Sequence, residues 1–324
     1  MTLAIEIKDL TRKYEVTKGI LHKRKSKISA LKGIDFDVKK GEIFGLLGPN
    51  GAGKTTTIKI LATLLAPTSG QAKVLGYDTF KDSKKLRPKI NFIFGGERSL
   101  YWRLSARDNL LYFSDLYKID RKIQKKRIPE LLEMVGIKDR ADEKVETYSK
   151  GMKQRLQIAR GLVNDPEIIF LDEPTIGLDP IGARDLRKII NKLSSLGKTI
   201  LLTTHYMHEA EELCNRVAII NNGKIIALDT PEGLKRLTVG KSVLEVKVLS
   251  VDDQKMEKMK KINDIESINV RNEQQFQIIQ LQYSGKEDIT ERVIKILEGC
   301  MILNVLTRVA TLEDAYIKLV GDEK

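Results

Sequence analysis

Short runs of apolar residues recur along the first two thirds of the chain, and segments with helical spacing separate them. A continuous apolar run of this kind is typical of a strand that is buried on both faces of a sheet. The runs are 42–47, 90–94, 168–171, 199–203 and 216–220. Because such strands alternate with helices, the pattern predicts an α/β core whose sheet is mainly parallel and is covered by helices on both faces.

The pattern changes at the N-terminus and again in the middle of the chain. Residues 3–8 and 30–38 alternate apolar and polar positions, as half-buried strands do, so we expect an antiparallel edge there. Between residues 105 and 165 the spacing is helical throughout. The apolar residues of this region form two sets, each on one helix face: Leu110, Leu111, Phe113, Leu116 and Tyr117, and Ile128, Leu131, Leu132 and Val135. We therefore expect a helical subdomain, at about residues 97–165, inserted into the α/β core.

A turn-rich stretch with a proline, residues 229–233, marks a change of pattern. Beyond it we expect strands at 243–248, 267–270, 276–283 and 301–307, and helices at 252–262 and 288–298. This βαββαβ order is that of the ferredoxin-like arrangement. The chain is therefore expected to form two domains, residues 1–228 and a small α+β accessory domain at residues 229–324.

Composition narrows the class of protein. The chain has 324 residues, of which 41% are hydrophobic and 31% charged, which suits a protein with sizeable cores that is not embedded in a membrane. No run approaches the roughly 18–20 apolar residues that span a bilayer, and the first residues have no signal-peptide pattern. Cys214 and Cys300 stand far apart, as reduced thiols do. These features favour an intracellular chain.

The formal net charge of +13 leaves several partners open. Much of the excess gathers in residues 18–27, a basic cluster that could meet nucleic acid or an anionic membrane surface. The same cluster could be a solvated lysine-rich loop. No aromatic residues are interleaved with it as in a surface that stacks bases. Charge alone therefore does not identify the partner.

A complete phosphate-binding loop follows the first apolar run and precedes a helix-like segment at residues 57–65. Its residues, Gly48, Pro49, Asn50, Gly51, Ala52, Gly53, Lys54, Thr55 and Thr56, are the candidate nucleotide contacts. The glycines let backbone N–H groups turn toward phosphate oxygens, and the helix N-terminus adds to this anion site. Lys54 can reach the β- and γ-phosphates, and the Thr55 hydroxyl can ligate Mg²⁺. The loop predicts that the chain binds a nucleoside triphosphate.

Two acidic residues end the apolar run at 168–171. Asp172 is expected at the carboxyl edge of the sheet beside the phosphate loop, where it can hold Mg²⁺ directly or through water. Glu173 follows and would point toward the γ-phosphate, where it could accept a proton from the attacking water. Because a phosphate loop needs both functions, we interpret these acids as catalytic rather than as a polar strand end.

About twenty residues earlier, Ser149 is a good N-cap for the helix that follows, and Gly151 leaves room beside the backbone. With this third motif, in this order, residues 1–228 resemble the ATP-binding subunit of an ABC transporter. The segment around Ser149 resembles the signature motif of that family, which is more often written Leu-Ser-Gly-Gly-Gln. Lys150 stands where many members have glycine.

The resemblance implies further site residues and a shared active site. Tyr14 matches the aromatic residue on which adenine stacks, His205 the switch histidine that contacts the γ-phosphate, and Gly177 to Asp179 the loop that couples the two sites of a dimer. In the family, two subunits stack head to tail, so that Ser149 and Gly151 of one would contact the γ-phosphate held by the other. ATP and Mg²⁺ are the implied ligands.

One loop departs from the pattern of the family. The best alignment places Gly96 where members carry a glutamine that contacts Mg²⁺ and the attacking water, with Glu97 beside it. Either Glu97 substitutes for the glutamine, or a water takes the place of its amide. The cluster Tyr101-Trp102-Arg103 that follows is suited to grip another protein, with core packing of Trp102 as the alternative.

The resemblance also implies partners and a location. Residues 311–321 resemble the end of the C-terminal extension of drug-exporter-type subunits, which favours export. The implied partners are an integral membrane transporter subunit and a second ATPase subunit, expected to be a second copy, with a paired heterodimer left open. The chain would act at the cytoplasmic face of the membrane, with no specific nucleic acid partner. The transported substrate is not determined by this sequence.

The alternative is a soluble ABC ATPase that acts on ribosomes or nucleic acid. The single phosphate loop speaks against the translation-factor type, which usually has two ATPase units in one chain. Only about 95 residues separate Lys54 from Ser149, without a sustained heptad pattern, which speaks against the genome-maintenance type with its long coiled coils.

Overall fold

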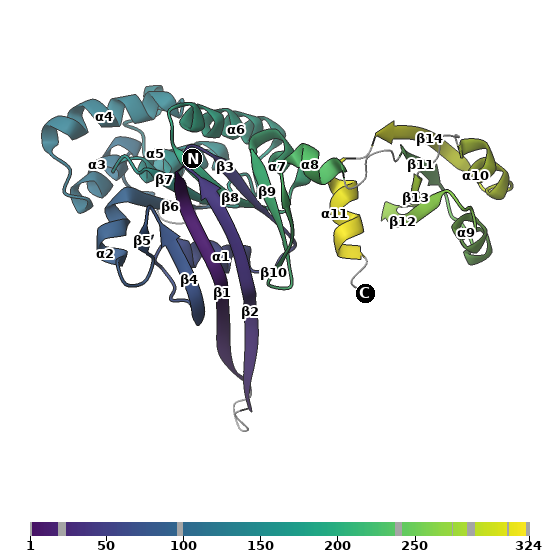
Figure 1. Ribbon diagram of the computed structural model, residues 1–324. Helices are drawn as coiled ribbons and strands as arrows, with labels where there is room; N and C mark the ends of the chain where they lie inside the picture. Colours follow the sequence, from purple (N-terminus) through teal and green to yellow (C-terminus); the bar gives the residue numbers. More distant parts are fainter. Residues whose placement is uncertain are drawn as a thin grey trace. The chain divides into compact units, whose positions relative to one another are not determined.

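The computed structural model describes residues 2–18, 24–95, 100–236, 242–273, 275–283, 289–309 and 311–321 (Figure 1). The chain divides into two compact units, Met1–Thr230 and Pro231–Lys324. Among the described residues, no helix has both the length and the apolar character needed to cross a bilayer.

A six-stranded sheet forms the centre of the first unit, in the order β10-β9-β3-β8-β7-β6. Its strands are β3 (Ile43–Leu47), β6 (Ile90–Phe94), β7 (Ile168–Asp172), β8 (Thr199–Thr204), β9 (Arg216–Asn221) and β10 (Lys224–Asp229). All neighbours pair in parallel except β10, which runs antiparallel to β9. The prediction of a mainly parallel sheet built from continuous apolar runs is therefore confirmed.

Helices cover both faces of this sheet. In Figure 1, α6 (Pro180–Ser195) lies on the opposite side of the sheet from α1 (Lys54–Leu61), and α7 (Met207–Leu213) is beside α6. Helix α1 shares one buried core with the six-stranded sheet and a second, antiparallel sheet. The stacked rings of Phe36 and Phe44, 5.1 Å apart, join the two sheets. The phosphate loop that precedes α1 is thus held between two rigid layers.

The antiparallel sheet has the order β2-β1-β4-β5. Its strands are β1 (Leu3–Lys18), β2 (Arg24–Lys39), β4 (Ser69–Val74) and β5 (Tyr77–Asp78). The edge predicted at 3–8 and 30–38 is confirmed, but both strands are much longer. Register shifts, such as those between Ile7 and Thr11, break the alternation along the hairpin, so the sequence pattern ends before the backbone pairing does.

The two ends of the basic cluster at residues 18–27 belong to β-strands, whereas a solvated loop was one of the structures predicted for it. Lys18 belongs to β1 and pairs with Arg24 of β2, which continues through Lys27. Residues 19–23 lie outside the described residues. A hairpin can extend through a basic segment in this way because the ladder hydrogen bonds, which join alternate residue pairs, are made by the backbone.

The helical region consists of α3 (Ala106–Leu116), α4 (Arg121–Met134) and α5 (Lys150–Gly161). Two short helical turns, Lys138–Arg140 and Val145–Thr147, lie between α4 and α5. Before this region, the short helix α2 (Ser83–Leu86) and a helical turn at Arg87–Lys89 lead into β6. The Ser105 side chain caps α3 and the Asp120 side chain caps α4, each by accepting a backbone N–H of the first turn. Most of the predicted apolar faces are buried, but Leu116 and Tyr117 are exposed at the end of α3. Their apolar spacing therefore marks a surface rather than a core.

The second unit is an α+β structure. It contains α8 (Pro231–Arg236), β11 (Ser242–Val248), α9 (Asp253–Lys260), β12 (Ile265–Glu273), β13 (Phe276–Tyr283), α10 (Thr290–Ile296), β14 (Ile302–Val309) and α11 (Leu312–Gly321). Its sheet has the order β12-β13-β11-β14 with antiparallel neighbours, which confirms the ferredoxin-like prediction. One face of the sheet packs against α9 and α10 in a core of its own. Exposed apolar residues of this unit include Leu249, Met301, Leu303 and Leu306.

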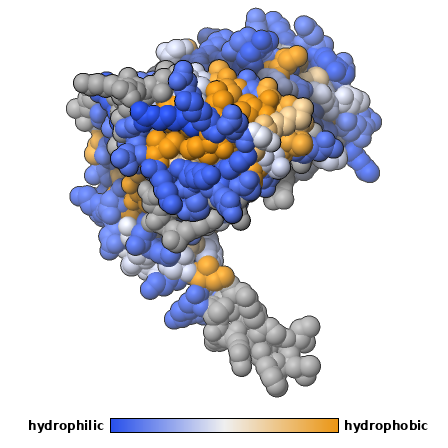
Figure 2. Space-filling model, turned by 90° about the vertical axis from the view of Figure 1, so that its right-hand side faces the viewer, coloured by the Kyte–Doolittle hydropathy of each residue, from blue (hydrophilic) through white to orange (hydrophobic). Residues whose placement is uncertain are grey.

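Some hydrophobic side chains are exposed on the surface of the protein. Figure 2 shows a face on which they lie exposed between bands of hydrophilic ones. Isolated exposed apolar residues are normal in folded proteins, so only a hollow or a contiguous patch among them points to binding.

Candidate functional site

The phosphate loop connects the buried strand β3 to helix α1. Gly48 is required here because a Cβ at this position would lie 2.2 Å from the carbonyl oxygen of Ile220. Gly53, the N-cap of α1, has φ of 113°, a conformation that favours glycine. The sequence therefore forms a tight turn whose backbone N–H groups lead into a helix N-terminus, the geometry that binds phosphate.

Lys54 lies at the centre of the loop with only 4% of its surface exposed. Its ammonium donates to the carbonyl oxygens of Gly48, at 2.6 Å, and Pro49, at 3.2 Å. It is also 3.3 Å from Oε1 of Glu173. The structure thus brings the loop lysine and the predicted base into direct ionic contact.

Asp172 ends β7 beside the start of α1. The hydroxyl of Thr55 donates toward both carboxylate oxygens of Asp172, at 3.1 and 3.0 Å. From the neighbouring strand β8, Thr203 donates to Oδ1 at 2.6 Å. A hydroxyl and a carboxylate side by side are the hard oxygen ligands that suit Mg²⁺, which is commonly held by one or two carboxylates together with substrate phosphates.

Glu173 has φ of 49°, a left-handed conformation that few residues other than glycine adopt. Its backbone N–H donates to both the carbonyl oxygen and the hydroxyl of Thr203, each at 3.1 Å. These contacts hold the strained turn in place and direct the side chain back toward the loop. Strain retained at such a position is typical of a functional site.

His205 follows β8 and faces the same carboxylate. Its Nδ1 lies 3.1 Å from Oε2 of Glu173, without the angles of a hydrogen bond, and its ring stacks at a tilt on Tyr206. The Glu173 carboxylate is therefore placed between Lys54 and His205, so that both of its oxygens face a residue of the predicted site.

Glu209 is a buried acid that the sequence reasoning missed. It lies on α7, four residues after His205, with 2% of its surface exposed. Burial raises the pKa of its carboxyl group. The hydroxyls of Thr204 and Thr175 offset part of this shift, although neither makes a hydrogen bond of good geometry to the carboxylate. A charged residue inside a helix carries no sequence signal that tells whether it will be buried.

Tyr14 lies near the phosphate loop, and a neighbouring side chain packs against its ring. Its hydroxyl is 3.5 Å from the hydroxyl of Thr56, and the guanidinium of Arg12 lies 4.8 Å from its ring centre. Arg12 covers one face of the ring through a cation–π contact. Only the other face would be open to a nucleotide base.

Ser149 and Gly151 begin α5. The Ser149 hydroxyl caps the helix by accepting the N–H of Met152 at 3.2 Å, and a Cβ on Gly151 would meet open space out to 4.0 Å. The hollow at the phosphate loop is lined by Ala30, Pro49, Asn50, Gly51, Gly53, Lys54, Thr55, Thr56 and Glu173. Within the described part of the chain, the structure does not bring Ser149 or Gly151 into that hollow. Ala30 is a lining residue that no sequence signal had singled out.

The loop that departs from the family pattern follows β6 and leads to Trp102. Gly96 and Glu97 lie outside the described residues, so the substitution by Glu97 stays a prediction. Trp102, just beyond, is 46% exposed and lies over Lys153 of α5, whose ammonium is 4.5 Å from the ring centre. Core packing of Trp102 is therefore wrong. The tryptophan connects the end of this loop to the helix that begins at the signature segment.

Comparisons with known proteins agree with this geometry. A family model described as "ABC transporter" matches residues 31–176. The linearmycin resistance ATP-binding protein LnrL of Bacillus subtilis is 37% identical over 250 residues, which are 77% of this chain and 80% of that protein. The daunorubicin resistance ATP-binding protein DrrA3 of Streptomyces coeruleorubidus is 32% identical over 304 residues, 93% of this chain and 94% of that protein. The second similarity extends across both units.

Solved structures of ATP-binding cassette proteins align with about 70% of this chain. The structure of cbiO1 from Clostridium perfringens, part of the ABC transporter complex cbiONQ, aligns with a TM-score of 0.63 and 29% identity over 72% of this chain and 90% of that one. A dimeric post-hydrolysis structure of the ATP-binding cassette MJ0796, bound to ADP and Pi, aligns with a TM-score of 0.61 and 29% identity over 70% and 98% of the two chains.

Proposed function

This chain belongs to the ABC transporter family as an ATP-binding, ATP-hydrolysing subunit of the exporter type, and on that premise we propose how its residues divide the work. The observation that carries the proposal is the placement of the Glu173 carboxylate between Lys54 and His205, next to Asp172. The name of the cbiO1 structure places that protein in an ABC transporter complex, and the names of LnrL and DrrA3 refer to drug resistance, which favours transport over the ribosome or nucleic-acid alternative.

The phosphates of ATP would bind to the loop from Gly48 to Thr56, with the adenine ring on Tyr14. Thr55 and Asp172 would hold Mg²⁺, which neutralises phosphate charge during the transfer. A γ-phosphate would compete with Glu173 for the ammonium of Lys54, now 3.3 Å away. Glu173, released from that contact, would accept the proton of the attacking water, and His205 would donate to the γ-phosphate.

Ser149 and Gly151 would complete the site of a second copy of this chain. They stand at the N-terminus of α5, a twelve-residue helix whose positive end favours a phosphate. Because the hollow at the phosphate loop does not include them, a single copy offers the loop and the acids without this cap. Two copies arranged head to tail would supply two complete sites, closed by ATP and opened by hydrolysis.

The membrane subunit would pack on the surface around the ends of β6 and α3. Two adjoining hollows there share Asn91 and Tyr117, and Leu64 and Leu116 lie exposed on their walls. Exposed apolar residues around a hollow are typical of a protein interface. The chain would therefore act at the cytoplasmic face of the membrane and drive export, with the substrate selected by the membrane subunit.

The role of Glu173 can be tested with Glu173→Gln. We expect ATP hydrolysis to fall by at least about 100-fold, because a positioned general base contributes about 10²–10⁴-fold, while ATP affinity stays nearly unchanged. Size-exclusion chromatography with ATP and Mg²⁺ should show a persistent dimer. Glu167→Gln, an exposed acid just before β7, is the matched control and should behave as wild type. Hydrolysis at the wild-type rate by the Glu173 variant would exclude it as the base.

Sharing of the site between two copies can be tested by mixing two inactive variants. Lys54→Ala disables the loop and Ser149→Arg blocks the signature segment, so neither should hydrolyse ATP alone. In an equimolar mixture about half of the dimers pair the two variants and keep one intact site, so about a quarter of wild-type activity should return. If each chain formed its site alone, mixing would restore nothing.

A further inference from the structure

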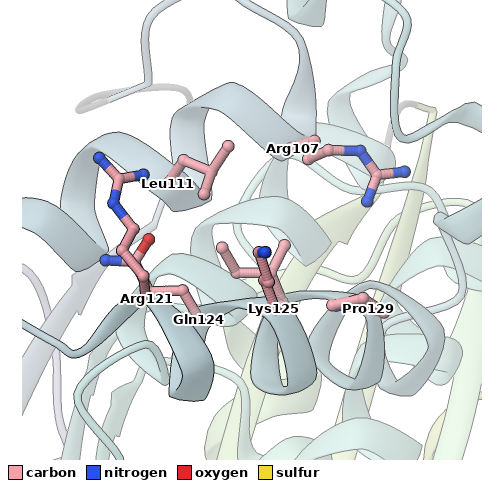
Figure 3. A pocket seen from close by; sticks show the side chains of 7 residues that line it. Arg107, Leu111, Arg121, Gln124, Lys125 and Pro129 are labelled. Carbon is pink, nitrogen blue, oxygen red and sulfur yellow. The ribbon is translucent and has the colours of Figure 1, made fainter.

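A further cavity, separate from the hollow at the phosphate loop, lies in the helical region (Figure 3). Its lining residues belong to α3 and α4. Its volume is about 320 Å³, at the lower end of the range of small-molecule sites. None of its lining residues takes part in the nucleotide site described above. It is therefore a candidate for a separate ligand.

Gln124 supplies a buried acceptor without a partner at this cavity. The side chain is 1% exposed, and its amide nitrogen donates to Oδ1 of Asp115 at 2.7 Å and to the carbonyl oxygen of Ile119 at 2.8 Å. Because both partners are acceptors only, the amide cannot be turned over, and its oxygen must face the other way. That oxygen has no hydrogen-bond partner among the described residues, and Figure 3 shows it on the side of the cavity.

As far as the described part of the chain shows, the rim of the cavity carries one cation without a paired carboxylate. Arg107 is held by both oxygens of Asp142, at 2.7 and 3.0 Å, and Arg121 pairs with Asp115 at 3.2 Å. Lys125 is exposed on the next turn of α4 after Arg121, and within the described ranges it makes no ion pair. An anion in the cavity would therefore meet the charge of Lys125, with the Arg121 guanidinium beside it.

Part of the cavity lining is apolar. Leu111 from α3 and Ile128 from α4 line it together with Pro129, which has no N–H to donate. Counting only the described residues, the cavity therefore combines an acceptor that lacks a donor, a cation that lacks an anion and a surface for carbon atoms. A simple inorganic anion would satisfy only the cation.

We propose that this cavity binds a phosphate ester that also carries a hydroxyl group. The phosphate contacts Lys125, the hydroxyl donates to Oε1 of Gln124, and the carbon skeleton packs on Leu111 and Ile128. Glycerol phosphate has this chemistry, either as a free molecule or as the headgroup of phosphatidylglycerol. The proposal is independent of the nucleotide site, since the two cavities share no residue.

The small-molecule arm uses the full chain with its phosphate loop saturated by ADP and Mg²⁺, so that the loop does not take up the probe. Calorimetric titration compares sn-glycerol 3-phosphate with methyl phosphate, which has a similar charge and no hydroxyl. The first should bind at least fivefold more tightly. Lys125→Glu should weaken binding at least tenfold, whereas Lys126→Glu, the same charge change at the adjacent exposed position, should not. Leu111→Trp, which fills the cavity, should also weaken binding.

The vesicle arm distinguishes the two sources of the ligand. Co-sedimentation with vesicles of phosphatidylglycerol and phosphatidylcholine, compared with phosphatidylcholine alone, should depend on Lys125 more than on Lys126 if the lipid headgroup is the ligand. Binding of glycerol phosphate without this dependence identifies a free ester. Equal affinity for methyl phosphate, equal loss in the two lysine variants, or no binding in either arm would overturn the proposal.

Discussion

Thr203 contacts both of the candidate acidic residues of the site, Asp172 and Glu173. Its hydroxyl donates to Oδ1 of Asp172 at 2.6 Å and accepts the backbone N–H of Glu173 at 3.1 Å. Both contacts arise because β7 and β8 pair in parallel, with Asp172 directly beside Thr203. A single hydroxyl on a neighbouring strand thus positions the candidate metal ligand and the candidate base at once.

Replacing this hydroxyl should slow turnover more than it weakens ATP binding. A hydrogen bond to a charged group contributes about 1.5–3 kcal/mol, so Thr203→Val should lower kcat by about tenfold or more, with a smaller change in ATP affinity. Steady-state ATPase assays and nucleotide titration measure the two effects. Thr199→Val, at the start of the same strand and away from the acids, is the control. An equal loss of kcat in both variants would point to strand packing instead.

At the scale of elements, β14 and α11 are joined by a partly buried ion pair, in which the carboxylate of Asp314 is buried and the guanidinium of Arg308 is partly exposed. Arg308 of β14 donates two hydrogen bonds to Asp314 of α11, at 2.6 and 3.0 Å, and the N–H and hydroxyl of Thr311 donate to the same carboxylate at 2.6 and 2.8 Å. Burial alone would raise the pKa of Asp314, but these four donors outweigh it and lower the pKa. The carboxylate therefore fixes the turn between the last strand and the last helix.

Asp314→Asn should loosen this pair of elements in a pH-dependent way. Because the pKa of Asp314 is lowered in the folded state, its stabilisation is complete above the ordinary aspartate pKa of about 3.9 and is lost as the pH falls through the lowered value. At neutral pH the variant should lose about 2–3 kcal/mol in the second unit. Hydrogen exchange of β14 and α11 peptides measures the change. The difference from wild type should shrink below about pH 4, and a constant difference would contradict the assignment.

At the scale of the whole molecule, the two units have separate cores. The buried cluster of the first unit uses residues between Ala4 and Ile220, and that of the second uses residues between Leu244 and Leu297. Each core is closed by its own sheet and helices. Independent folding of the two units is a prediction from this separation.

A truncated chain ending at Thr230 should therefore fold and bind ATP. Its affinity should stay within about threefold of the full chain, because every residue proposed for the nucleotide site lies in the first unit. Circular dichroism and nucleotide titration test this. A truncated chain that is soluble but fails to bind ATP would show that the second unit supports the site.

Much of the site was predictable because its residues occur at the ends of local patterns. Lys54 begins a helix that follows a buried strand, and Asp172 and Glu173 stand at the end of a second buried strand. The apolar runs and the glycines of the loop therefore predicted that all three residues lie at one edge of a parallel sheet. Residues 90–94 and the βαββαβ order were also predicted from local patterns, since burial on both faces leaves a continuous apolar run and burial on one face leaves an alternation. Core packing, the alternative for Trp102, is wrong, and Leu116 is exposed although it shares a face with buried residues, because apolar spacing does not distinguish a core from an exposed surface.

The amino-acid sequence by itself thus determined the fold class, the family and the list of residues that could handle a triphosphate. Only the tertiary structure showed that Thr203 lies beside Asp172 and that Glu209 is buried on α7. It also showed that, among the described residues, the side-chain oxygen of Gln124 has no hydrogen-bond partner. The physical reason is that strand order, burial and hydrogen-bond pairing are properties of neighbours that lie far apart along the chain. Local periodicity records which residues share a face, but it does not record which groups that face will meet.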